Sequence, residues 1–595
     1  MRNAVAFANN DVAMIAWSYG ERPDDCMGFA LYRIDSQGQE TPLPSHAVFK
    51  GDTIKEGQTT AEFPVQKFYW KDPYARLVGE KTQNFSFRYK IVPLEGKPGA
   101  LTPMPSLPIM TTNEVTVSGV CSPSLTAIFN RGLISTQHVS QALEGDVSSN
   151  KLLTMIKDPT NPLRKDLAGD ITATLTGFVA RAKTGGSIYA ALYEMTDVQL
   201  LQALEDIGNK LNIVLANIVG KPKSGGSEET AGENDDSETK LKGSAGSLLY
   251  RTPPSGHIVH NKFLVYVDAG GVAQAVLTGS CNWTDTGLCA QTNNSIVIQD
   301  KGVAARYMAY WNKLKADETA HQKGGAFQGT PLRTFNGTAK DLKLDQGSES
   351  ASTLTSYFSP NTPKQRSKAK GKVEPVPVDM KDLKDRVIAA KNAVLFLAFI
   401  PGTPSITEFA AAAQKANKSL FVRGCVTAPD AAGNFYYDLK GTSPPKKQKG
   451  VKSPPAPQDA RVIAANALGK AIPEGWQKEL LKAGFAITHD KIVVIDPFAD
   501  DCVVVTGSHN LGYQASYNND ENLLMIQGNK NLAMAYATHV LDVYDHFSWR
   551  WALNQGKGSP DAHLKSTPGE WLDWYFDAQG QIKTAQLKFW MQATI

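Results

Sequence analysis

Two stretches of the chain share one arrangement of polar and apolar positions. Each begins with His-x-Lys, continues into an apolar run at 263–267 or 492–495, closes that run with Asp, and is followed by Gly-Ser-x-Asn. β-Branched and aromatic residues dominate both runs, and such residues are typical of buried strands. The repeat therefore predicts two similar strands, each carrying the same polar residues at its start.

The segments before each copy also repeat in kind. Predicted strands lie over 187–193, 212–217, 393–399 and 419–424, and predicted helices lie over 198–211 and 406–416. Strand, helix, strand in this order predicts a mixed α/β lobe. Because the order occurs twice, we expect an internally duplicated body with a site at the pseudo-twofold seam between its lobes.

The chain divides into three predicted regions. Residues 1–112 hold strand-like segments between turn-rich ones, and with Trp17 early and Tyr89 on a late strand this region resembles a fibronectin type III-like β-sandwich. The first α/β lobe is predicted over 113–345 and the second over 346–595.

Three polar segments interrupt this plan. Residues 221–247 are rich in Gly, Ser, Glu and Asp and are predicted to be a disordered surface insertion. Residues 343–379 are rich in Ser, Pro and Lys and are predicted to link the lobes. Residues 441–456 form a basic insertion, which is either a solvated loop or a peripheral contact for an anionic membrane or nucleic acid. Its cations are Lys446, Lys447, Lys449 and Lys452.

Length and composition agree with a multidomain globular protein. The chain has 595 residues, of which 42% are apolar, and a net charge of +4. That charge is too small to indicate nucleic acid or a membrane as partner. The six Cys residues show neither metal-ligand spacing nor a dense disulfide framework, which favours reduced thiols.

The first residues lack the basic start and apolar core of a signal peptide. No apolar run reaches the roughly 20 residues that span a bilayer. We therefore expect a soluble, cytoplasmic protein with no transmembrane segment, although export by a specialised secretion machine would leave no such mark.

Alternate residues of a strand share a face, so the His and Lys of His-x-Lys point the same way. This pairs His260 with Lys262 and His489 with Lys491. In Gly-Ser-x-Asn the Gly permits a tight turn, while Ser and Asn offer short hydrogen-bonding groups. The candidates there are Ser280, Asn282, Ser508 and Asn510.

A pocket built from both copies would hold two imidazoles, two ammonium groups and two amides, a set that suits a phosphodiester. One neutral His attacks phosphorus and forms a phosphohistidine. The other His, protonated, gives its proton to the leaving oxygen. Lys and Asn hold the developing negative charge. His titrates near neutrality, so one pocket can contain one neutral and one charged imidazole.

These paired motifs resemble the HKD motifs of the phospholipase D superfamily, from about residue 115 onward. The resemblance implies a two-step double displacement through a phosphohistidine, with no metal and no cofactor. It also implies that the Asp of each motif, Asp268 and Asp496, is structural. Five residues separate Lys262 from Asp268, whereas four separate Lys491 from Asp496. One added residue near the strand end, as in a bulge, explains the difference.

A second asymmetry concerns the residue eleven positions after each Gly-Ser-x-Asn. It is Glu521 in the second copy and Asn293 in the first. An acidic residue here orients a catalytic His in the family, and a carboxylate favours imidazolium more than an amide does. The two His are therefore expected to differ in role. The resemblance favours His260 as nucleophile and His489 as acid.

The substrate stays open between two classes. Chains of this family with both motifs are often phospholipid enzymes, which favours headgroup hydrolysis or transfer of the phosphatidyl group to an alcohol. The alternative is a nuclease that cleaves DNA or RNA. An apolar rim favours lipid, and aromatic stacking platforms favour nucleic acid. A third reading, an inactive scaffold, conflicts with the presence of all six polar residues, because burying them is costly without a site.

Overall fold

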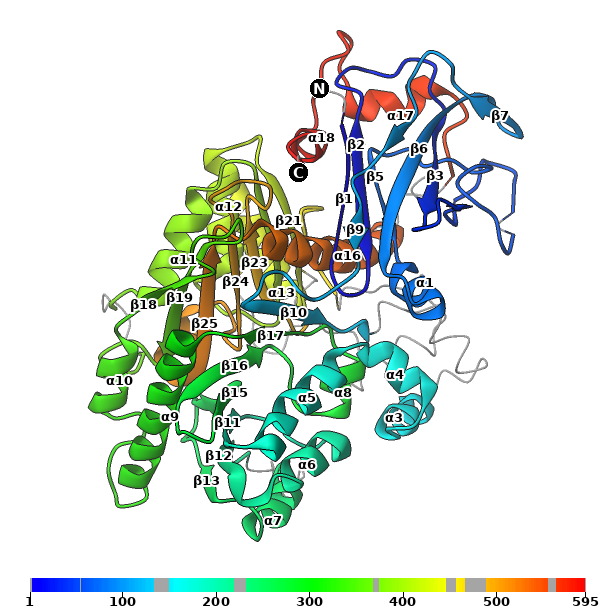
Figure 1. The fold of residues 1–595 in the computed structure, drawn as a ribbon. Helices are drawn as coiled ribbons and strands as arrows, with labels where there is room; N and C mark the ends of the chain where they lie inside the picture. The colour runs from blue at the N-terminus through cyan, green and yellow to red at the C-terminus, as the bar shows by residue number, and fades with distance from the viewer. Residues whose placement is uncertain are drawn as a thin grey trace.

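The computed structural model describes residues 3–45, 47–53, 55–132, 149–218, 232–366, 374–445, 456–465, 488–554 and 563–593. The chain forms an N-terminal β domain and two α/β halves (Figure 1). In that view the β domain stands at the upper right, the first half lies at the bottom, and the second half lies at the upper left. No helix in the described part of the chain is long and apolar enough to cross a membrane.

Two sheets make up the N-terminal domain. One contains β1 (Asn3–Ala8), β2 (Ala13–Ser18) and β5 (Tyr69–Asp72). The other contains β3 (Gly28–Ile34), β4 (Glu40–Pro42), β6 (Ser86–Lys97), β7 (Ala100–Pro103), β8 (Met110–Thr111) and β9 (Val115–Thr116), and α1 (Ala75–Thr82) follows β5. Trp17, Phe29 and Tyr89 from both sheets share one apolar core. The two sheets agree with the expected sandwich, whereas the fibronectin type III likeness stays a prediction.

The end of the chain returns to this domain. Helices α17 (Pro568–Tyr575) and α18 (Ala585–Trp590) stand beside its strands in Figure 1. Trp571 packs in the core of the sandwich, and its indole Nε1 donates to the Cys26 carbonyl at 2.9 Å. The second lobe was predicted over 346–595, and the last two helices of that range pack against the N-terminal domain.

The first half is a seven-stranded sheet in the order β10-β17-β16-β15-β11-β12-β13. Its strands are β10 (Leu125–Phe129), β11 (Ser187–Leu192), β12 (Leu211–Ala216), β13 (Ser247–Arg251), β15 (Lys262–Val267), β16 (Ala273–Gly279) and β17 (Asn294–Ile298). Its helices are α3 (Ser149–Lys157), α4 (Pro162–Ala168), α5 (Ile171–Thr184), α6 (Val198–Glu205), α7 (Asp235–Lys242), α8 (Asp285–Cys289), α9 (Lys301–His321) and α10 (Thr330–Asn336).

Helix α7 corrects one prediction. Residues 221–247 were expected to be disordered, yet Asp235–Lys242 is helical and Ser247 begins β13. Acidic residues fill the first turn of α7 and Lys residues its last turn, which suits the helix dipole. The buried Leu241 anchors the helix to the apolar core of the first half. The remainder of the predicted insertion, 219–231, lies outside the described residues.

The second half repeats this plan in the order β18-β19-β25-β24-β23-β20-β21-β22. Its strands are β18 (Lys340–Leu344), β19 (Ser352–Ser359), β20 (Ala393–Ala398), β21 (Phe421–Val426), β22 (Val462–Ala464), β23 (Lys491–Ile495), β24 (Val503–Gly507) and β25 (Asn519–Gln527). Its helices are α11 (Val378–Ile388), α12 (Ile406–Ala416), α13 (Pro429–Lys440), α15 (Tyr513–Asn518) and α16 (Lys530–Asn554).

Two predictions about this half need comment. Residues 343–379 were expected to be a linker, but β18 and β19 pair within the sheet. The alternation of Thr, Leu, Tyr and Phe in Ser352–Ser359 suits a strand better than the composition of the whole segment suggests. The four Lys residues of the basic insertion lie outside the described residues.

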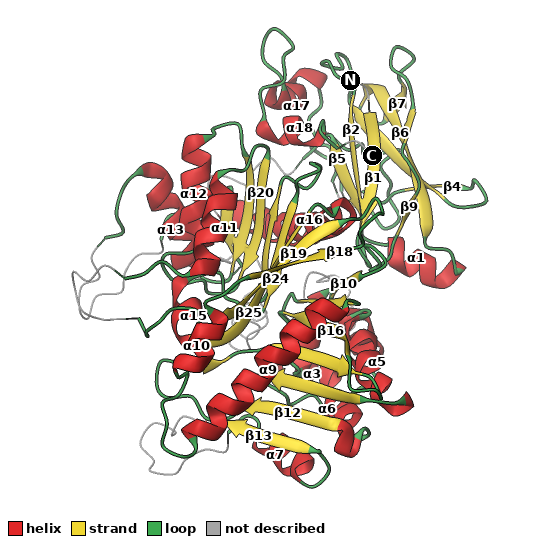
Figure 2. Cartoon of the chain, turned by 60° about the vertical axis from the view of Figure 1, so that its left-hand side comes forward, coloured by secondary structure: helices red, strands yellow, loops and turns green. Residues whose placement is uncertain are grey.

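Apart from the added edge strand β18, the two sheets have the same strand order and the same pattern of parallel and antiparallel pairs. They share one apolar core, to which α9 contributes Tyr307 and Trp311 and α16 contributes Tyr536. Figure 2 shows α9 running across the strands of the first sheet. Both His-x-Lys copies begin central strands, β15 and β23, so the sheets bring them toward one seam.

Candidate active site

Each His-x-Lys copy is held at its start by the other half of the molecule. Strand β14 (Ile258–Val259) pairs in parallel with the start of β25, and the His260 N–H donates to the Asp520 carbonyl at 2.9 Å. In mirror fashion, the His489 N–H donates to the Thr292 carbonyl, just before β17, at 3.1 Å. Backbone hydrogen bonds therefore join the two halves at both His residues.

These hydrogen bonds between the halves determine which side chain faces each imidazole. Nδ1 of His260 lies 2.8 Å from Oε1 of Glu521, and Nδ1 of His489 lies 2.9 Å from Oδ1 of Asn293. The asymmetry expected from the sequence is present, but each partner serves the His of the opposite copy. A carboxylate or amide oxygen accepts the proton on Nδ1, so in both rings Nε2 is the atom left for chemistry.

The two Lys side chains return to the backbone of their own motif. Lys262 Nζ donates to the His260 carbonyl at 2.9 Å, and Lys491 Nζ donates to the His489 carbonyl at 2.6 Å. Lys491 differs because its Nζ also lies 3.1 Å from Nε2 of His489. Each His precedes the strand that its Lys opens, with one residue between them, and the second pair is in direct side-chain contact.

The Gly-Ser-x-Asn turns supply the next groups. Nδ2 of Asn282 donates to the Glu194 carboxylate, and the Asn510 backbone N–H donates to Oε2 of Glu521 at 3.0 Å. The side-chain oxygens of both Asn282 and Asn510 are buried without a hydrogen-bond partner in the protein. Unpaired buried polar atoms are uncommon, and these two amide oxygens could accept, but not donate, a further hydrogen bond.

The two Ser residues of the turns hydrogen-bond to the segments that follow those turns. Ser280 Oγ donates to Asn293 Oδ1 at 2.8 Å, the atom that also faces His489. Ser508 Oγ accepts the backbone N–H of Asn522 at 3.0 Å. Both hydroxyls therefore fix the turn and the strand after it.

The two Asp residues of the motifs are bound in turns at the far ends of their strands. Asp496 accepts the backbone N–H groups of Lys391, Asn392 and Ala393 at 2.8, 2.7 and 2.7 Å. Asp268 accepts the Val272 N–H at 2.9 Å. The pairing of β15 with β16 shifts register beside Tyr266, where the added residue was expected. The extra residue therefore changes the strand end and leaves the His-x-Lys start unchanged.

Two aromatic side chains at the site were missed by the sequence reasoning. Tyr193 directly follows β11, and Phe399 directly follows β20. Their ring centroids lie 5.0 Å from His260 and 4.8 Å from His489, edge to face. The same rings stand 5.0 and 5.2 Å from the ammonium groups of Lys262 and Lys491. The signal was the recurrence of an aromatic residue at the end of both equivalent strands.

Glu194 is the other residue that was missed. It follows Tyr193 and contacts Asn282, while its counterpart after Phe399 is the exposed Ile400. Burial and the neighbouring Glu233 raise the pKa of Glu194 to about 7. The two sides of the site therefore differ in charge as well as in the partners of the imidazoles.

Burial is the main cause of the pKa shifts of the two His and two Lys residues. Burial and then the Lys262 ammonium lower the pKa of His260 to about 4. Burial also lowers the pKa of Lys262 to about 7, and with neighbouring cations it lowers the pKa values of His489 and Lys491 well below their ordinary values. Each half-site responds to charges of the other, since Lys491 acts on His260 and Lys262 acts on His489. These shifts favour the neutral forms in the free protein, and a bound anion would favour the protonated forms instead.

Glu521 is the charged exception. Burial opposes its ionisation, but His260 and further donors hold its pKa at about 2. Glu521 is therefore a carboxylate at neutral pH, beside an imidazole that is neutral in the free protein.

Two Asn side chains, one from each half, form hydrogen bonds to the opposite half at the seam. Asn294 donates to Asp490 of the second half at 2.9 Å and accepts from Thr506 at 2.8 Å. Asn522 donates to Asn261 of the first half at 3.3 Å and accepts from Thr278 at 2.8 Å. Asn261 and Asp490 are the central residues of the two His-x-Lys triplets. This network fixes the triplets relative to each other.

No metal-ligand cluster of three or more His, Cys, Asp or Glu side chains occurs within the described ranges. The polar groups that converge here are imidazoles, ammonium groups and amides. Donors of this kind bind an oxyanion directly.

Two segments of the chain, residues 178–315 and 451–544, match the family described as cardiolipin synthase, PLD-like domain. The first segment contains His260 and the second contains His489. Together the two segments cover less than half of the chain, and each is similar to this PLD-like domain. No curated protein sequence gives a significant match.

Solved structures give weak similarities. Phosphatidylserine synthase from Haemophilus influenzae Rd KW20 has 11% identity and a TM-score of 0.38, over 64% of this chain and 85% of that chain. The phospholipase D family member Nuc from Salmonella typhimurium has 20% identity and a TM-score of 0.18, over 24% and 84%. Polyphosphate kinase from Porphyromonas gingivalis has 11% identity and a TM-score of 0.33, over 84% and 70%. At these scores the likeness carries no functional argument.

Proposed function

We propose that this protein is a phosphodiesterase of the phospholipase D type that works through a phosphohistidine. One observation carries the proposal: the two His-x-Lys copies converge from equivalent strands of the two halves, and each His is held by the opposite half. The common strand order of the sheets supports an internal duplication, with the site at its seam.

His260 takes the role of nucleophile. Glu521 holds the proton on Nδ1, which leaves the lone pair of Nε2 free to attack phosphorus. As the bond from Nε2 to phosphorus forms, the ring gains positive charge, and the ionised Glu521 stabilises that charge. The carboxylate thus supports the assignment of His260 through the charge of its intermediate.

His489 takes the role of acid and base. Its partner Asn293 is a neutral amide, so the imidazolium of His489 gives up its proton more readily than one beside a carboxylate. The bound phosphodiester supplies the negative charge that lets His489 hold this proton first. His489 protonates the leaving oxygen, and in the second step it takes a proton from the attacking water.

The Lys and Asn side chains stabilise the phosphoryl oxygens. Lys262 and Lys491 each donate to the carbonyl of the His in their own motif, and Asn282 and Asn510 end the Gly-Ser-x-Asn turns. Charge on the oxygens that do not leave grows little in such a reaction, so these donors act mainly by position and electrostatics. The chemistry needs no metal.

For the substrate we favour a phospholipid, through headgroup hydrolysis or transfer to an alcohol. Two large apolar side chains beside the motifs are exposed: Ile258, two residues before His260, at 37%, and Ile400, next to Phe399, at 53%. Apolar residues at a pocket rim suit an acyl chain or glycerol backbone. The rings of Tyr193 and Phe399 pack edge to face against the imidazoles, so they already have packing partners within the site.

The test is a parallel turnover assay of the purified protein. One arm measures headgroup release from phospholipid vesicles, and the other measures cleavage of single- and double-stranded nucleic acid. We expect headgroup release that disappears in both His260→Ala and His489→Ala and persists in the presence of a chelator. Cleavage of nucleic acid alone would replace the lipid assignment with a nuclease. Absence of turnover on both classes by the folded protein would contradict the proposal.

A further inference from the structure

We propose that the N-terminal β domain positions His489 for catalysis, and that Asn130 is the positioning residue that transmits this contact. The inference rests on the proposed function, because it assigns His489 the role of acid and base. It gives the N-terminal domain a task that its fold alone does not indicate. The path has three steps, each made of direct hydrogen bonds.

The first step joins the loop between β1 and β2 to the end of β10. The buried Asn10 side chain pairs with both backbone groups of Phe129: its Nδ2 donates to the Phe129 carbonyl at 3.1 Å, and its Oδ1 accepts the Phe129 N–H at 2.9 Å. An amide that satisfies both groups acts like one residue of a neighbouring strand. The N-terminal domain thus extends the pairing of β10 at the point where the strand ends.

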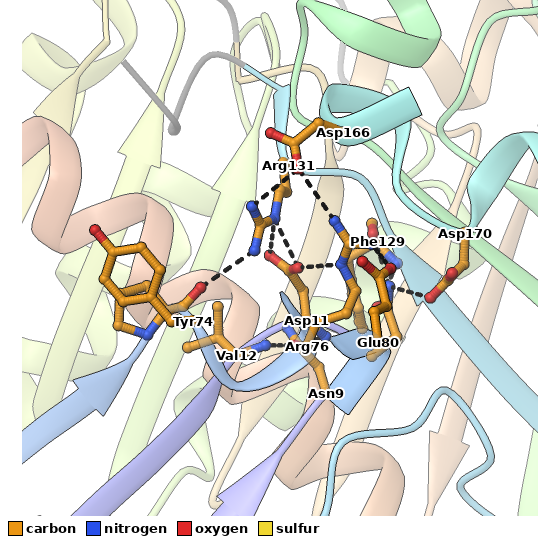
Figure 3. A network of polar contacts seen from close by, with 12 residues as sticks. Asn9, Asp11, Val12, Tyr74, Arg76, Glu80, Phe129, Arg131, Asp166 and Asp170 are labelled. Atoms are coloured by element: carbon orange, nitrogen blue, oxygen red, sulfur yellow. Dashed lines mark hydrogen bonds and ion pairs between the residues drawn. The ribbon is translucent and has the colours of Figure 1, made fainter. Parts of the chain in front are cut away.

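Charge strengthens the same junction (Figure 3). Asp11 accepts from Arg131 Nε at 2.7 Å and from Arg76 Nε at 2.8 Å. Arg131 also donates to the Pro73 carbonyl at 3.1 Å. Figure 3 shows Asp11 between the two guanidinium groups, with Asp166 on their other side. A partly buried carboxylate, 13% exposed, that accepts from two Arg residues restrains the orientation of the backbone that carries them.

The second step is Asn130, which lies between the two clamped residues. Its Nδ2 donates to two carbonyls of α8 and one just after it, those of Gly287, Leu288 and Gln291, at 3.3, 2.8 and 2.8 Å. Its Oδ1 accepts the backbone N–H of Asn293 at 2.8 Å. The side chain is 3% exposed, so water does not substitute for these contacts.

The third step is Asn293 itself. Its Oδ1 faces Nδ1 of His489 at 2.9 Å, and its Nδ2 donates to the Gly287 carbonyl at 2.9 Å, a group that Asn130 also contacts. Asn130 therefore holds Asn293 at its backbone and through a shared acceptor. The amide oxygen of Asn293 in turn keeps the proton of His489 on Nδ1 and its Nε2 directed to the substrate.

Within the described part of the chain, the N-terminal domain makes no such contact at the equivalent position of the second half. The residue equivalent to Asn130 is Ser359, which pairs with Glu521 in the strand register as Asn130 meets Asn293. The hydroxyl of Ser359 is buried with no hydrogen-bond partner. The external clamp therefore acts on the side of the site that serves His489.

The positioning of His489 is expected to affect the second chemical step, the hydrolysis of the phosphohistidine. In that step the oxygen of water bonds to phosphorus, the bond between phosphorus and Nε2 of His260 breaks with its electrons returning to Nε2, and the proton of water passes to Nε2 of His489. A His489 ring that rotates freely performs this transfer poorly, because the reaction needs the ring held in one orientation. His489 also protonates the leaving oxygen in the first step, so a loosened clamp should let the phosphoenzyme accumulate with bis(p-nitrophenyl) phosphate, whose leaving group needs no proton.

The experiment compares full-length variants of the clamp with matched controls. Asn130→Ala and Asp11→Asn are expected to lower kcat by about 10-fold to 100-fold with KM changed far less, and to accumulate the covalent adduct on His260. Ser359→Ala, at the equivalent position, and Glu40→Gln, which removes a surface charge of the same domain, should retain the turnover of the wild type. Asp11→Asn keeps the shape of the side chain, so it tests the clamp if Asn130→Ala fails to fold.

A second measurement separates this inference from the proposed function. In protein labelled with 15N-histidine, the ring nitrogens of His489 report the site of its proton without any turnover. We expect a single Nδ1–H form in the wild type and in both controls, and a mixture of forms in Asp11→Asn. Wild-type turnover and an unchanged His489 signal in Asp11→Asn would overturn the positioning role. An inactive wild type would contradict the proposed function, while the signal of His489 would still decide this inference.

Discussion

The two half-sites share a backbone plan and differ in what touches each imidazole. Nδ1 of His260 faces the carboxylate of Glu521, and Lys262 donates to the His260 carbonyl. Nδ1 of His489 faces the amide of Asn293, and Lys491 also reaches its Nε2. A carboxylate stabilises a ring that becomes a cation, while an amide favours a ring that exchanges a proton. Equivalent strands therefore carry unequal roles.

The largest expected effect comes from removing each imidazole in turn. We expect His260→Asn to abolish all reaction with bis(p-nitrophenyl) phosphate, because no nucleophile remains. His489→Asn should slow turnover by about 10² to 10⁴-fold yet keep one burst of p-nitrophenol, since this leaving group needs no proton. Stopped-flow absorbance measures the burst. A burst in His260→Asn and none in His489→Asn would reverse the roles.

The next effect comes from exchanging the partners of the rings. Glu521→Gln is expected to lower kcat by about 10-fold to 100-fold, because the cationic intermediate on His260 loses its charged hydrogen bond. Asn293→Asp should instead raise the pKa of His489 and shift the pH dependence of kcat toward higher pH. Steady-state pH profiles of the two variants, measured beside the wild type, test this. Equal effects of both variants on kcat and on its pH dependence would contradict unequal roles.

Anion binding should take up protons. Burial holds the pKa of Lys262 at about 7 and those of His489 and Lys491 well below their ordinary values, and an anion raises all three. Binding of sulfate, which keeps its charge in this range, should weaken as pH rises above 7, by about tenfold per pH unit for each linked proton.

Calorimetry in buffers of different ionisation enthalpy counts the protons taken up. Lys262→Met should remove the component near pH 7. Sulfate binding that strengthens with rising pH would exclude a cationic pocket.

The smallest effect concerns the Asp residues of the motifs and falls on stability alone. Asp496→Asn is expected to cost about 1–3 kcal/mol of unfolding free energy, because an amide N–H would replace one acceptor of three backbone donors. Asp268→Asn, in a hairpin turn, should cost less than Asp496→Asn. Urea denaturation measures both. A loss of kcat without loss of stability in Asp496→Asn would argue for a catalytic Asp.

The sequence predicted the strands of the site because local patterns determine them. The apolar runs after His260 and His489 and the turns at Asn282 and Asn510 were recognised from residue type and spacing. The side-chain partner of each His could not be predicted from the sequence. It depends on the hydrogen bonds of His260 and His489 to the opposite half, which form only when the two halves pack together. Tyr193 and Phe399 carried a usable signal that was overlooked, since both follow equivalent strands.

The fold was less predictable where contacts join distant segments. Helix α7 lies in a polar stretch, and a few buried residues decide its packing there. Trp571 packs in the N-terminal domain although more than five hundred residues separate it from β3. Composition indicated a linker over 343–379, but pairing with β25 made part of it a strand. In each case tertiary contact outweighed local preference.

The most direct test of the central claim is the site of the covalent adduct. His489→Asn would be mixed with a phosphodiester substrate, quenched in alkali to preserve phosphohistidine, digested, and mapped by mass spectrometry. The account predicts a phosphoryl-linked adduct on the peptide that contains His260 and its absence in His260→Asn. An adduct on another residue, or turnover in the wild type with no adduct in any variant, would contradict the account.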